Sequence, residues 1–341
     1  MDLTTTWDGL PVAEDPPHGA AILVYRWERG ERRWLVLHRA HRGPDYEGEW
    51  AWGPPSGARL PGEPVVDGAV RELEEETGLV LPLIEVDLDR DWAAFMAEAP
   101  ADAGVRLSAE HNAFAWLPLA DALRRISPAI VSSQLERDAA SLPAVLPPDR
   151  AGLAEAARLL LQGEVIAFPT DTVYGLAALA RETGAAERIY EVKRRPHSQQ
   201  LIAMAAEAAG FDGLVAVEGW HREYMERWWP GPLTLVLPTL DGTGTLGVRV
   251  PDHPVALDLL REVGEPLLTT SANLSSRPPA MTAFEAASLI GIAAVLDGGE
   301  APGGVPSTVA SLVGDEPEVL RPGPISADQL RRTASDRGRR R

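Results

Sequence analysis

In the first 140 residues, the pattern of apolar and polar positions is typical of strands in some segments and of helices in others. Apolar runs of about eight residues between turn-prone segments predict strands, and apolar positions spaced three and four apart predict helices. The expected elements are strands at 20–27, 33–40 and 111–119 and helices at 64–78 and from about 119 onward. Together they predict an α+β unit over residues 17–140, with residues 1–16 as an extension before it.

The second part of the chain alternates helix and strand signals more regularly. A Pro-rich, weakly patterned stretch at 141–150 predicts a linker, and an amphipathic helix at 151–163 leads into an apolar strand at 164–170. The alternation continues almost to the end, which favours a mixed α/β sheet with functional loops at strand ends. We expect one domain at 151–326 and a basic, solvated tail at 327–341.

Composition supports two globular domains in a chain of 341 residues, with 45% hydrophobic and 24% charged positions. The chain has no cysteine, which excludes disulfides and Cys-ligated zinc or iron–sulfur sites. No apolar run approaches the roughly 18 residues that cross a bilayer. Residues 1–15 do not resemble a signal peptide, so we expect no membrane contact and a cytoplasmic location.

Acidic residues are unevenly distributed. Residues 1–140 contain 25 acidic and 13 basic side chains, and residues 141–341 contain 25 and 19. The net charge of −18 argues against general nucleic-acid binding, which needs surplus positive surface. The excess in the first part suggests a domain that gathers divalent cations.

A set of charged residues and glycines with fixed spacing lies in the first domain. Its members are Gly57, Glu63, Arg71, Glu72, Glu75, Glu76 and Gly78. On a helix, Glu72, Glu75 and Glu76 stand at i, i+3 and i+4, and crowded carboxylates repel one another unless a cation lies between them. Such oxygen ligands favour Mg²⁺ or Mn²⁺. The alternative is a solvated acidic helix face.

The spacing matches every position of the Nudix box, so residues 17–140 resemble the Nudix hydrolases and their α/β/α sandwich. The resemblance implies Mg²⁺-dependent attack of water on a nucleoside diphosphate derivative. It assigns Glu72, Glu75 and Glu76 as metal ligands or base, with Glu75 taken as catalytic. Gly57 would offer a backbone carbonyl to the metal, and Glu63, Arg71 and Gly78 would support the box. Ser56 departs from the glycine that many members have there.

Two further features of this domain allow two interpretations each. Glu110 is either an additional ligand or base, or an ordinary surface glutamate. Trp50 and Trp52 either stack on a nucleobase or are buried in the core. Nothing in the sequence names the substrate, and a nucleotide-sensing or structural role is the alternative to catalysis.

Hydroxyl, amide and guanidinium groups gather in loops of the second domain. Residues 170–174 directly follow an expected strand, at the end where α/β sheets bind ligands. Later loops add Thr245, Arg249, Thr269, Thr270, Ser271, Asn273, Ser307, Thr308 and Arg321. Hydroxyls combined with fixed cations suit a ligand that bears phosphates and carboxylates. The only lysine of the chain, Lys193, lies in the segment Lys-Arg-Arg-Pro.

The order of these segments is similar to that of the threonylcarbamoyl-adenylate synthases, the YrdC-like family, over residues 150–325. The matching segments are PTDTVYGL, Lys193 with Arg195-Pro196, PGPLT, VRVPDHP, SAN, STV and RPG. The resemblance implies a twisted mixed α/β sheet and a reaction in which L-threonine, bicarbonate and ATP give threonylcarbamoyl-adenylate and pyrophosphate, the first step toward t6A in tRNA. A hydrogenase-maturation carbamoyltransferase also contains such a unit, but its zinc-finger cysteines are absent here.

The resemblance also implies a role for each matching residue. It implies that threonine is bound by Thr172, Arg249, Thr269 and Ser307, and that ATP is bound by Arg195, Gln199, Thr245, Ser271 and Arg321. Further substrate contacts would be Thr170 and Tyr174. The residues implied in catalysis are Lys193, Arg195 and Asn273. Three positions depart from the family pattern: Met204 replaces a histidine, Gln199 replaces the commoner Asn, and Ser276 replaces a glycine.

An RNA-binding module is the alternative for the second domain, although its negative charge count argues against it. Possible partners besides the small substrates are tRNA, which the basic tail would contact, and the downstream threonylcarbamoyl-transfer proteins.

Overall fold

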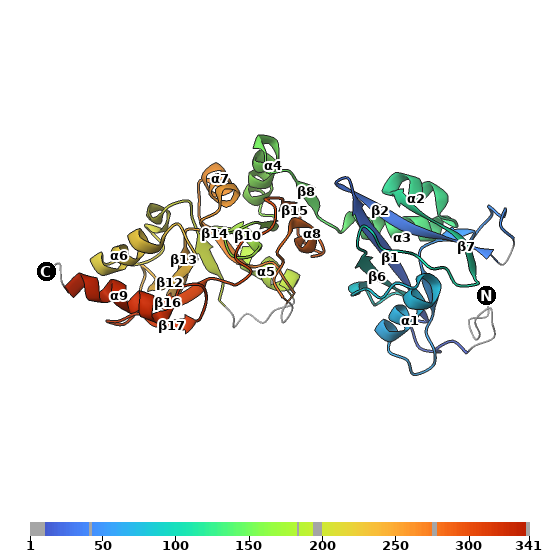
Figure 1. Cartoon of the computed structure of the whole chain (residues 1–341), viewed down its shortest axis with the longest axis horizontal. Helices are drawn as coiled ribbons and strands as arrows, with labels where there is room; N and C mark the ends of the chain where they lie inside the picture. Colours follow the sequence, from blue (N-terminus) through green and yellow to red (C-terminus); the bar gives the residue numbers. More distant parts are fainter. Residues whose placement is uncertain (1–10, 41–42, 183, 194–199, 275–277, 339–341) are drawn as a thin grey trace. The chain divides into compact units, whose positions relative to one another are not determined.

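The computed structural model divides into two compact units, residues 1–141 and 142–341. The structure describes residues 11–338 apart from 41–42, 183, 194–199 and 275–277. Each unit has a mixed β-sheet with helices packed against it (Figure 1). Among the residues described, no helix is long and apolar enough to cross a lipid bilayer.

The first unit has a seven-stranded sheet with the order β3-β2-β1-β6-β5, in which β4 pairs with β1 and β7 pairs with β2. Its strands are β1 (Gly19–Glu28), β2 (Glu31–Arg39), β3 (Trp52–Gly53), β4 (Ser56–Ala58), β5 (Ile84–Asp87), β6 (Trp92–Glu98) and β7 (His111–Pro118), and its helices are α1 (Val65–Thr77), α2 (Leu119–Arg125) and α3 (Ala129–Ala140). β1 runs parallel to β6 and antiparallel to β2. The strands and the helix expected from periodicity are confirmed.

Helices cover both faces of the first sheet, as expected for an α/β/α sandwich (Figure 1). Figure 1 places α1 on one side of the sheet and α2 on the other. The apolar face of α1 buries Ala69 and Leu73 in a cluster with Ile22 and Phe95 of the sheet. Gly78 ends α1 with a left-handed φ of 67°, a conformation that costs glycine little.

The second unit has a ten-stranded mixed sheet with the order β17-β16-β12-β13-β11-β14-β10-β9-β15-β8. Its strands are β8 (Ala144–Leu146), β9 (Ile166–Phe168), β10 (Gly175–Leu179), β11 (Ile202–Met204), β12 (Leu233–Pro238), β13 (Thr245–Arg249), β14 (Leu267–Ser271), β15 (Ala294–Leu296), β16 (Thr308–Ser311) and β17 (Glu318–Arg321). Its α-helices are α4 (Arg150–Leu161), α5 (Ala185–Lys193), α6 (Gly219–Trp228), α7 (Pro254–Val263), α8 (Ala283–Ala286) and α9 (Ala327–Gly338).

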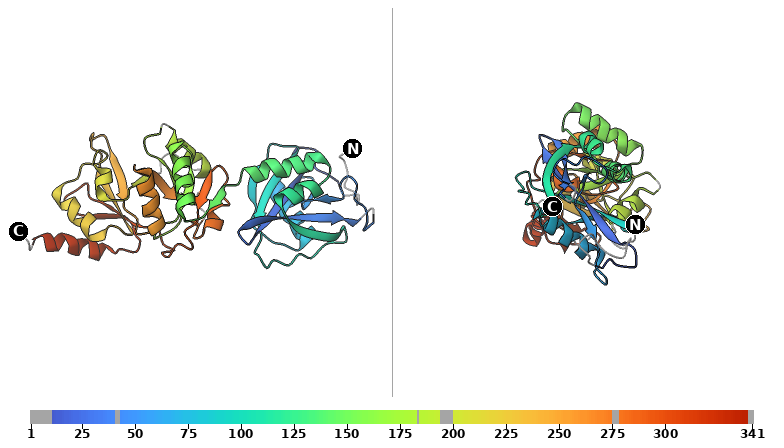
Figure 2. Two further views of the ribbon diagram at one scale, coloured as in Figure 1. Left: turned by 90° about the horizontal axis from the view of Figure 1, so that it is seen from above. Right: turned by 90° about the vertical axis from the view of Figure 1, so that its right-hand side faces the viewer.

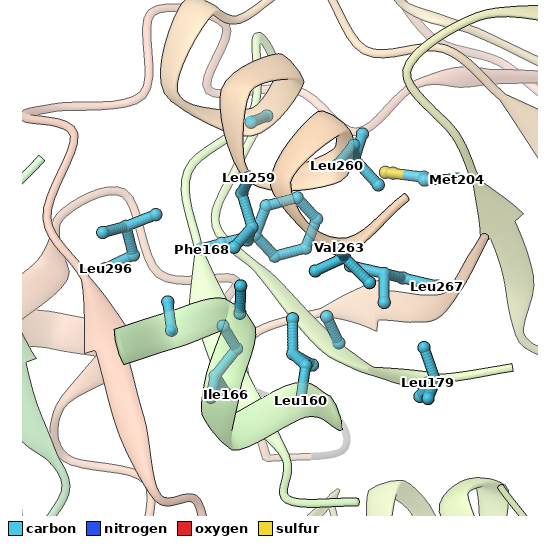
Figure 3. Close-up of a cluster of buried hydrophobic side chains, with 14 of the residues drawn as sticks. Leu160, Ile166, Phe168, Leu179, Met204, Leu259, Leu260, Val263, Leu267 and Leu296 are labelled. Carbon is cyan, nitrogen blue, oxygen red and sulfur yellow. The ribbon is translucent and has the colours of Figure 1, made fainter. Parts of the chain in front are cut away.

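Two hydrophobic clusters hold this sheet to its helices. α4 and α7 lie side by side (Figure 2) and cover β9, β10, β14 and β15, and Figure 3 shows Leu259 of α7 next to the ring of Phe168. The second cluster joins α6 and α9 to β12, β13 and β16, with Phe211 and Leu235 fully buried. The loops that carry the candidate site are therefore anchored on a packed sheet.

Two segments differ from the expectations of the sequence. Residues 141–150, expected as a linker, include β8, which pairs in parallel with β15 at the edge of the second sheet. Residues 327–338, expected as part of a solvated tail, form α9. Leu330 of α9 is 1% exposed, the Tyr224 hydroxyl donates to its carbonyl oxygen at 3.2 Å, and the Trp228 indole N–H donates to Thr333 Oγ1 at 3.2 Å. Both segments were misread because their apolar residues find partners far away in the sequence.

Replacing Leu330 with alanine tests the docking of α9. The substitution removes a buried side chain and leaves a cavity, so the free energy of unfolding of the second unit should fall by about 2 to 5 kcal/mol. Chemical denaturation with hydrogen exchange read peptide by peptide separates the two units. The control is Arg331→Ala on the exposed face of the same helix, which should change stability by less than about 1 kcal/mol. Equal small effects would mean that α9 is not docked.

Candidate active sites

A cavity of about 480 Å³ in the second unit gathers side chains from segments far apart in the sequence. The residues expected at this site that line the cavity are Thr170, Thr172, Tyr174, Lys193, Thr245, Arg249, Thr269, Thr270, Ser271, Asn273, Ser307 and Arg321. Thr308 does not line it, because its buried hydroxyl donates to Ile325 O at 2.8 Å. The expected contacts of Arg195 and Gln199, and the departure at Ser276, fall outside the described residues. The tertiary structure thus brings the sequence motifs together at one place.

Lys193 is the last residue of α5, and its side chain is buried in a set of oxygen acceptors. The ammonium group donates to the carbonyl oxygens of Ser271 at 2.5 Å and Asn273 at 2.8 Å, and to Asn273 Oδ1 at 2.9 Å. The hydroxyl of Ser271 also donates to Asn273 Oδ1, at 2.6 Å. These bonds fix a compact positive charge at the wall of the cavity and hold the loop that follows β14.

Arg249 ends β13 and supplies a second buried positive charge, with a side chain 2% exposed. Its Nε donates to Gly231 O at 2.9 Å, its Nη1 to Thr172 Oγ1 at 3.1 Å and its Nη2 to Asp171 Oδ1 at 2.6 Å. Burial lowers the pKa of Arg249, and the Asp171 carboxylate opposes that shift. The guanidinium group therefore stays charged in a fixed orientation.

Ser307 and Arg321 form a third polar group at the cavity, where β16 and β17 meet. Arg321 Nη2 donates to the carbonyl oxygen of Ser307 at 2.9 Å and to its hydroxyl at 3.1 Å. The Ser307 hydroxyl also bonds Thr234 Oγ1 at 2.8 Å. A Cβ on Gly323 would lie 2.4 Å from the backbone nitrogen of Thr308, so only glycine lets the chain after Arg321 pass this close.

Tyr174, Met204 and Thr269 line the same cavity but differ in what they offer a ligand. The Tyr174 hydroxyl donates to Gly299 O at 2.7 Å and accepts from Gly298 N at 3.1 Å, so it holds a loop. Burial raises the pKa of Tyr174 to about 12, which keeps the hydroxyl protonated. Met204, in place of a histidine, is an apolar wall residue that also packs in the core. Thr269 bonds Ile202 O only weakly, at 3.4 Å.

The acidic set of the first unit is organised around Arg71. Its guanidinium group donates to both oxygens of Glu63 at 3.0 Å, to Glu72 at 2.7 Å and to Glu75 at 3.3 Å. Another N–H donates to Ala58 O at 3.0 Å. Glu63 and Arg71 therefore fix the loop before α1 against the helix.

Glu72 and Glu76 are the buried carboxylates of this set. Glu76 is 4% exposed, accepts a hydrogen bond from the Ser56 backbone N–H at 2.9 Å and lies 3.8 Å from His111 Nε2. Burial raises the pKa of Glu76 to about 8, and burial also raises the pKa of Glu72. A Cβ on Gly57 would lie 1.8 Å from the Glu72 carboxyl carbon, so glycine is required here.

The structure brings together fewer carboxylates than expected for a metal. Within the described part of the chain, no group of three or more His, Asp or Glu side chains could hold a metal ion. Glu75, with a side chain 59% exposed, is paired with Arg71. Glu75 and Glu76 are successive residues and point about 100° apart around the helix axis, so Glu75 turns outward when Glu76 turns inward. The chemistry of Glu72 and Glu76 still fits a divalent cation, because buried carboxylates with raised pKa values gain from positive charge.

Glu110, Trp50 and Trp52, which the sequence left with two interpretations each, differ in their burial and surroundings. After burial, the charge of Glu110 is a smaller contribution to the raised pKa values of Glu72 and Glu76. Trp52 is 7% exposed and packs between His38 and Arg125, at 4.8 and 4.3 Å, so its stacking on a nucleobase is contradicted. Trp50 is 41% exposed and has a φ of 67°.

Comparisons with known proteins find a family match in each half of the chain. A family model named Sua5_yciO_yrdC, described as "Telomere recombination", matches residues 158–323, and the NUDIX domain model matches residues 16–134. The threonylcarbamoyl-AMP synthase of Xanthomonas axonopodis pv. citri is 39% identical over 163 residues, which cover 44% of this chain and 87% of that protein. The chain belongs to the threonylcarbamoyl-AMP synthase family.

Other members of the threonylcarbamoyl-AMP synthase family are longer. The Bacillus subtilis protein of that name is 44% identical over 190 residues, which cover 52% of this chain and 55% of the relative, so the chain spans about half the length of that protein. A solved structure of Pyrococcus abyssi Sua5 complexed with L-threonine is similar with a TM-score of 0.53 and 34% identity, covering 56% of this chain and 60% of that chain.

Several residues of the site in this threonylcarbamoyl-AMP synthase family member have no role predicted from the sequence. Asp171 stands inside the PTDT motif, which was the available signal, and Thr234 shows none because a threonine in a strand is ordinary. In the Nudix unit, Arg39 and His111 lie near Glu76. Their contacts depend on strand pairing and could not be found from local spacing.

Glu76 predicts a pH dependence for the first unit in the presence of a chelator. Its pKa is about 8 in the folded state, whereas the ordinary value is 4.5. Between these values the folded state keeps a proton that the unfolded state has already released, so raising the pH lowers the stability of the folded state. Burial lowers the pKa of His111 to about 4, so the titration of His111 affects stability only below about pH 6.5, its ordinary pKa. The melting temperature should therefore fall from pH 6.5 to 8, and Glu76→Gln should remove this fall. An unchanged slope in Glu76→Gln contradicts the prediction.

Proposed function

We propose that the second unit forms threonylcarbamoyl-adenylate and pyrophosphate from L-threonine, bicarbonate and ATP. The observation that carries this proposal is the gathering of Lys193, Arg249, Ser271, Asn273 and Arg321 at one cavity. Similarity to proteins named threonylcarbamoyl-AMP synthase, and to a solved structure with L-threonine, supports the substrate class.

The reaction joins two anions. The threonine amine takes up the CO₂ of bicarbonate with release of water and becomes a carbamate, one carbamate oxygen bonds the α-phosphorus of ATP, and the bond to pyrophosphate breaks. Charge neutralisation and alignment are the main demands of such a step. The cavity meets these demands with Lys193 and Arg249, which are both buried, and with Arg321, which also lines it.

The residues divide between the substrates as the resemblance implies. Thr172, Arg249, Thr269 and Ser307 serve threonine. Thr245, Ser271 and Arg321, together with Arg195 and Gln199, serve ATP. Thr170 supports this arrangement, since its hydroxyl donates to Val173 O at 2.6 Å and bonds Thr172 Oγ1 at 3.0 Å.

Pyrophosphate release tests this proposal directly. Release that requires both threonine and bicarbonate would support the enzyme, and release that ignores threonine would contradict it. An RNA-binding module, the other candidate, predicts tRNA binding without such release. Contact with tRNA or with downstream threonylcarbamoyl-transfer proteins, and a cytoplasmic location, remain predictions.

Lys193→Arg should reduce the rate of pyrophosphate release by about 100-fold or more. The three oxygens around Nζ fit a compact ammonium group, whereas a planar guanidinium must displace the loop after β14, and misplacement by about 1 Å can cost 10²-fold. The control is Arg158→Lys on the exposed face of α4, which should keep the rate. A near-normal rate for Lys193→Arg would show that charge alone is needed.

For the first unit, we propose divalent-cation-dependent hydrolysis of a nucleoside diphosphate derivative, with Mg²⁺ as the expected cation and Mn²⁺ as its substitute. The NUDIX match and the buried pair Glu72 and Glu76 support this. When bound, such a cation polarises a phosphoryl oxygen and makes water more acidic. Glu72 and Glu76 would hold it, Gly57 leaves room for Glu72, and Arg71 orients Glu72.

Glu72→Gln should reduce Mg²⁺-dependent hydrolysis of a panel of nucleoside diphosphate derivatives by about 100-fold or more, because it removes one buried negative charge from the cation site. The matched control is Glu74→Gln on the same helix, whose side chain is exposed. Loss of hydrolysis in both variants, or in neither, would contradict the assignment of Glu72. Release of pyrophosphate by the second unit should be unchanged in both variants.

A further inference from the structure

Arg249 is a buried cation that requires a fixed counter-charge. Its side chain is 2% exposed, and an unpaired charge at such a depth would strongly destabilise the fold. Asp171 supplies the counter-charge, with Oδ1 at 2.6 Å from Arg249 Nη2 and a side chain 10% exposed. Asp171 comes from the segment between β9 and β10, whereas Arg249 belongs to β13.

Arg249 lines the cavity, and its contacts leave part of its hydrogen-bonding capacity unused. An arginine has five N–H donors. Gly231, Thr172 and Asp171 accept one donor each from Nε, Nη1 and Nη2. One N–H on each terminal nitrogen therefore has no partner among the residues described. Two N–H groups of this kind form the fork that binds a carboxylate with two parallel hydrogen bonds.

Asp171 is itself held in position. Its Oδ1 accepts a second hydrogen bond from the backbone N–H of Asp252, at 3.1 Å. The carbonyl oxygen of the next residue, Thr172, accepts from Gly304 N at 2.9 Å. A Cβ on Gly303 would lie 2.6 Å from Asp171 O, so the 303–304 loop closes tightly over this segment. The carboxylate is thus fixed from two sides.

The two oxygens of Asp171 differ in their contacts. Among the described residues, Asp171 Oδ2 is buried without a hydrogen-bond partner, and so is the neighbouring His253 Nδ1. A buried oxygen without a partner costs folding free energy. Asp171 therefore contributes a negative charge and one hydrogen-bond acceptor to Arg249.

We propose that Asp171 is a positioning residue for the amino-acid substrate: it holds Arg249 so that the free edge of the guanidinium group binds the substrate carboxylate. The inference rests on the proposed function of the second unit and deepens it. Asp171 itself does not line the cavity, so it acts through Arg249. It therefore sets selectivity for a free carboxylate over an uncharged amide.

Asp171→Asn tests the proposal, because asparagine keeps an oxygen that can accept from Arg249 and from Asp252 N but removes the charge. We expect the KM for L-threonine to rise about tenfold, with kcat and the KM for ATP changed less than twofold. In the wild type, L-threonine should bind more tightly than L-threoninamide by calorimetry, and Asp171→Asn should reduce this preference. Asp171→Ala should raise the KM further, with the conservative variant partly rescuing it.

Matched measurements separate the possible outcomes. Asp258→Asn removes an exposed carboxylate on α7 and should leave all three constants unchanged. If Asp171→Asn lowers the melting temperature but changes the constants for threonine and ATP equally, Asp171 is only structural. An unchanged or lower KM for threonine also overturns the proposal. If the wild type shows neither threonine binding nor threonine-dependent pyrophosphate release, the proposed function itself fails.

Discussion

The ammonium group of Lys193 ties the end of α5 to the loop after β14, and the candidate site of the second unit is built around this contact. A buried ammonium group is tolerated only when fixed oxygens replace its water. Ser271 and Asn273 provide these oxygens from residues 78 and 80 positions further along the chain. The contact therefore stabilises the loop and, at the same time, fixes where a ligand anion meets the positive charge.

The ion pair between Arg249 and Asp171 complements this arrangement, because Arg249 lines the same cavity. In the sheet, β11, β14 and β10 separate β13 from β9, so the pair spans several strands. Each buried cation thus depends on a loop that its own strand or helix does not carry. The cavity walls are coupled, because a shift of one loop would leave a charge without its partner.

The candidate site of the first unit is also built around buried charges that are fixed by residues of another segment, but these charges are negative. Buried carboxylates replace buried cations, and Arg71 joins the helix to the loop before it. The raised pKa values of Glu72 and Glu76 show that the surrounding protein does not fully neutralise these charges. A site of this kind favours a cationic ligand, whereas the cavity of the second unit favours anions. The two units therefore suit different chemistry.

The sequence by itself determined most elements of both folds and the membership of the candidate sites. Periodicity and motif spacing are local properties, and they located α1 with its acidic face as well as the segments that meet at the cavity. Only the tertiary structure decided that β8 joins the second sheet and that α9 is docked, because the partners of both lie far away in the sequence. It also decided that Glu75 faces outward and that Asp171 holds Arg249, since such contacts depend on distances in space.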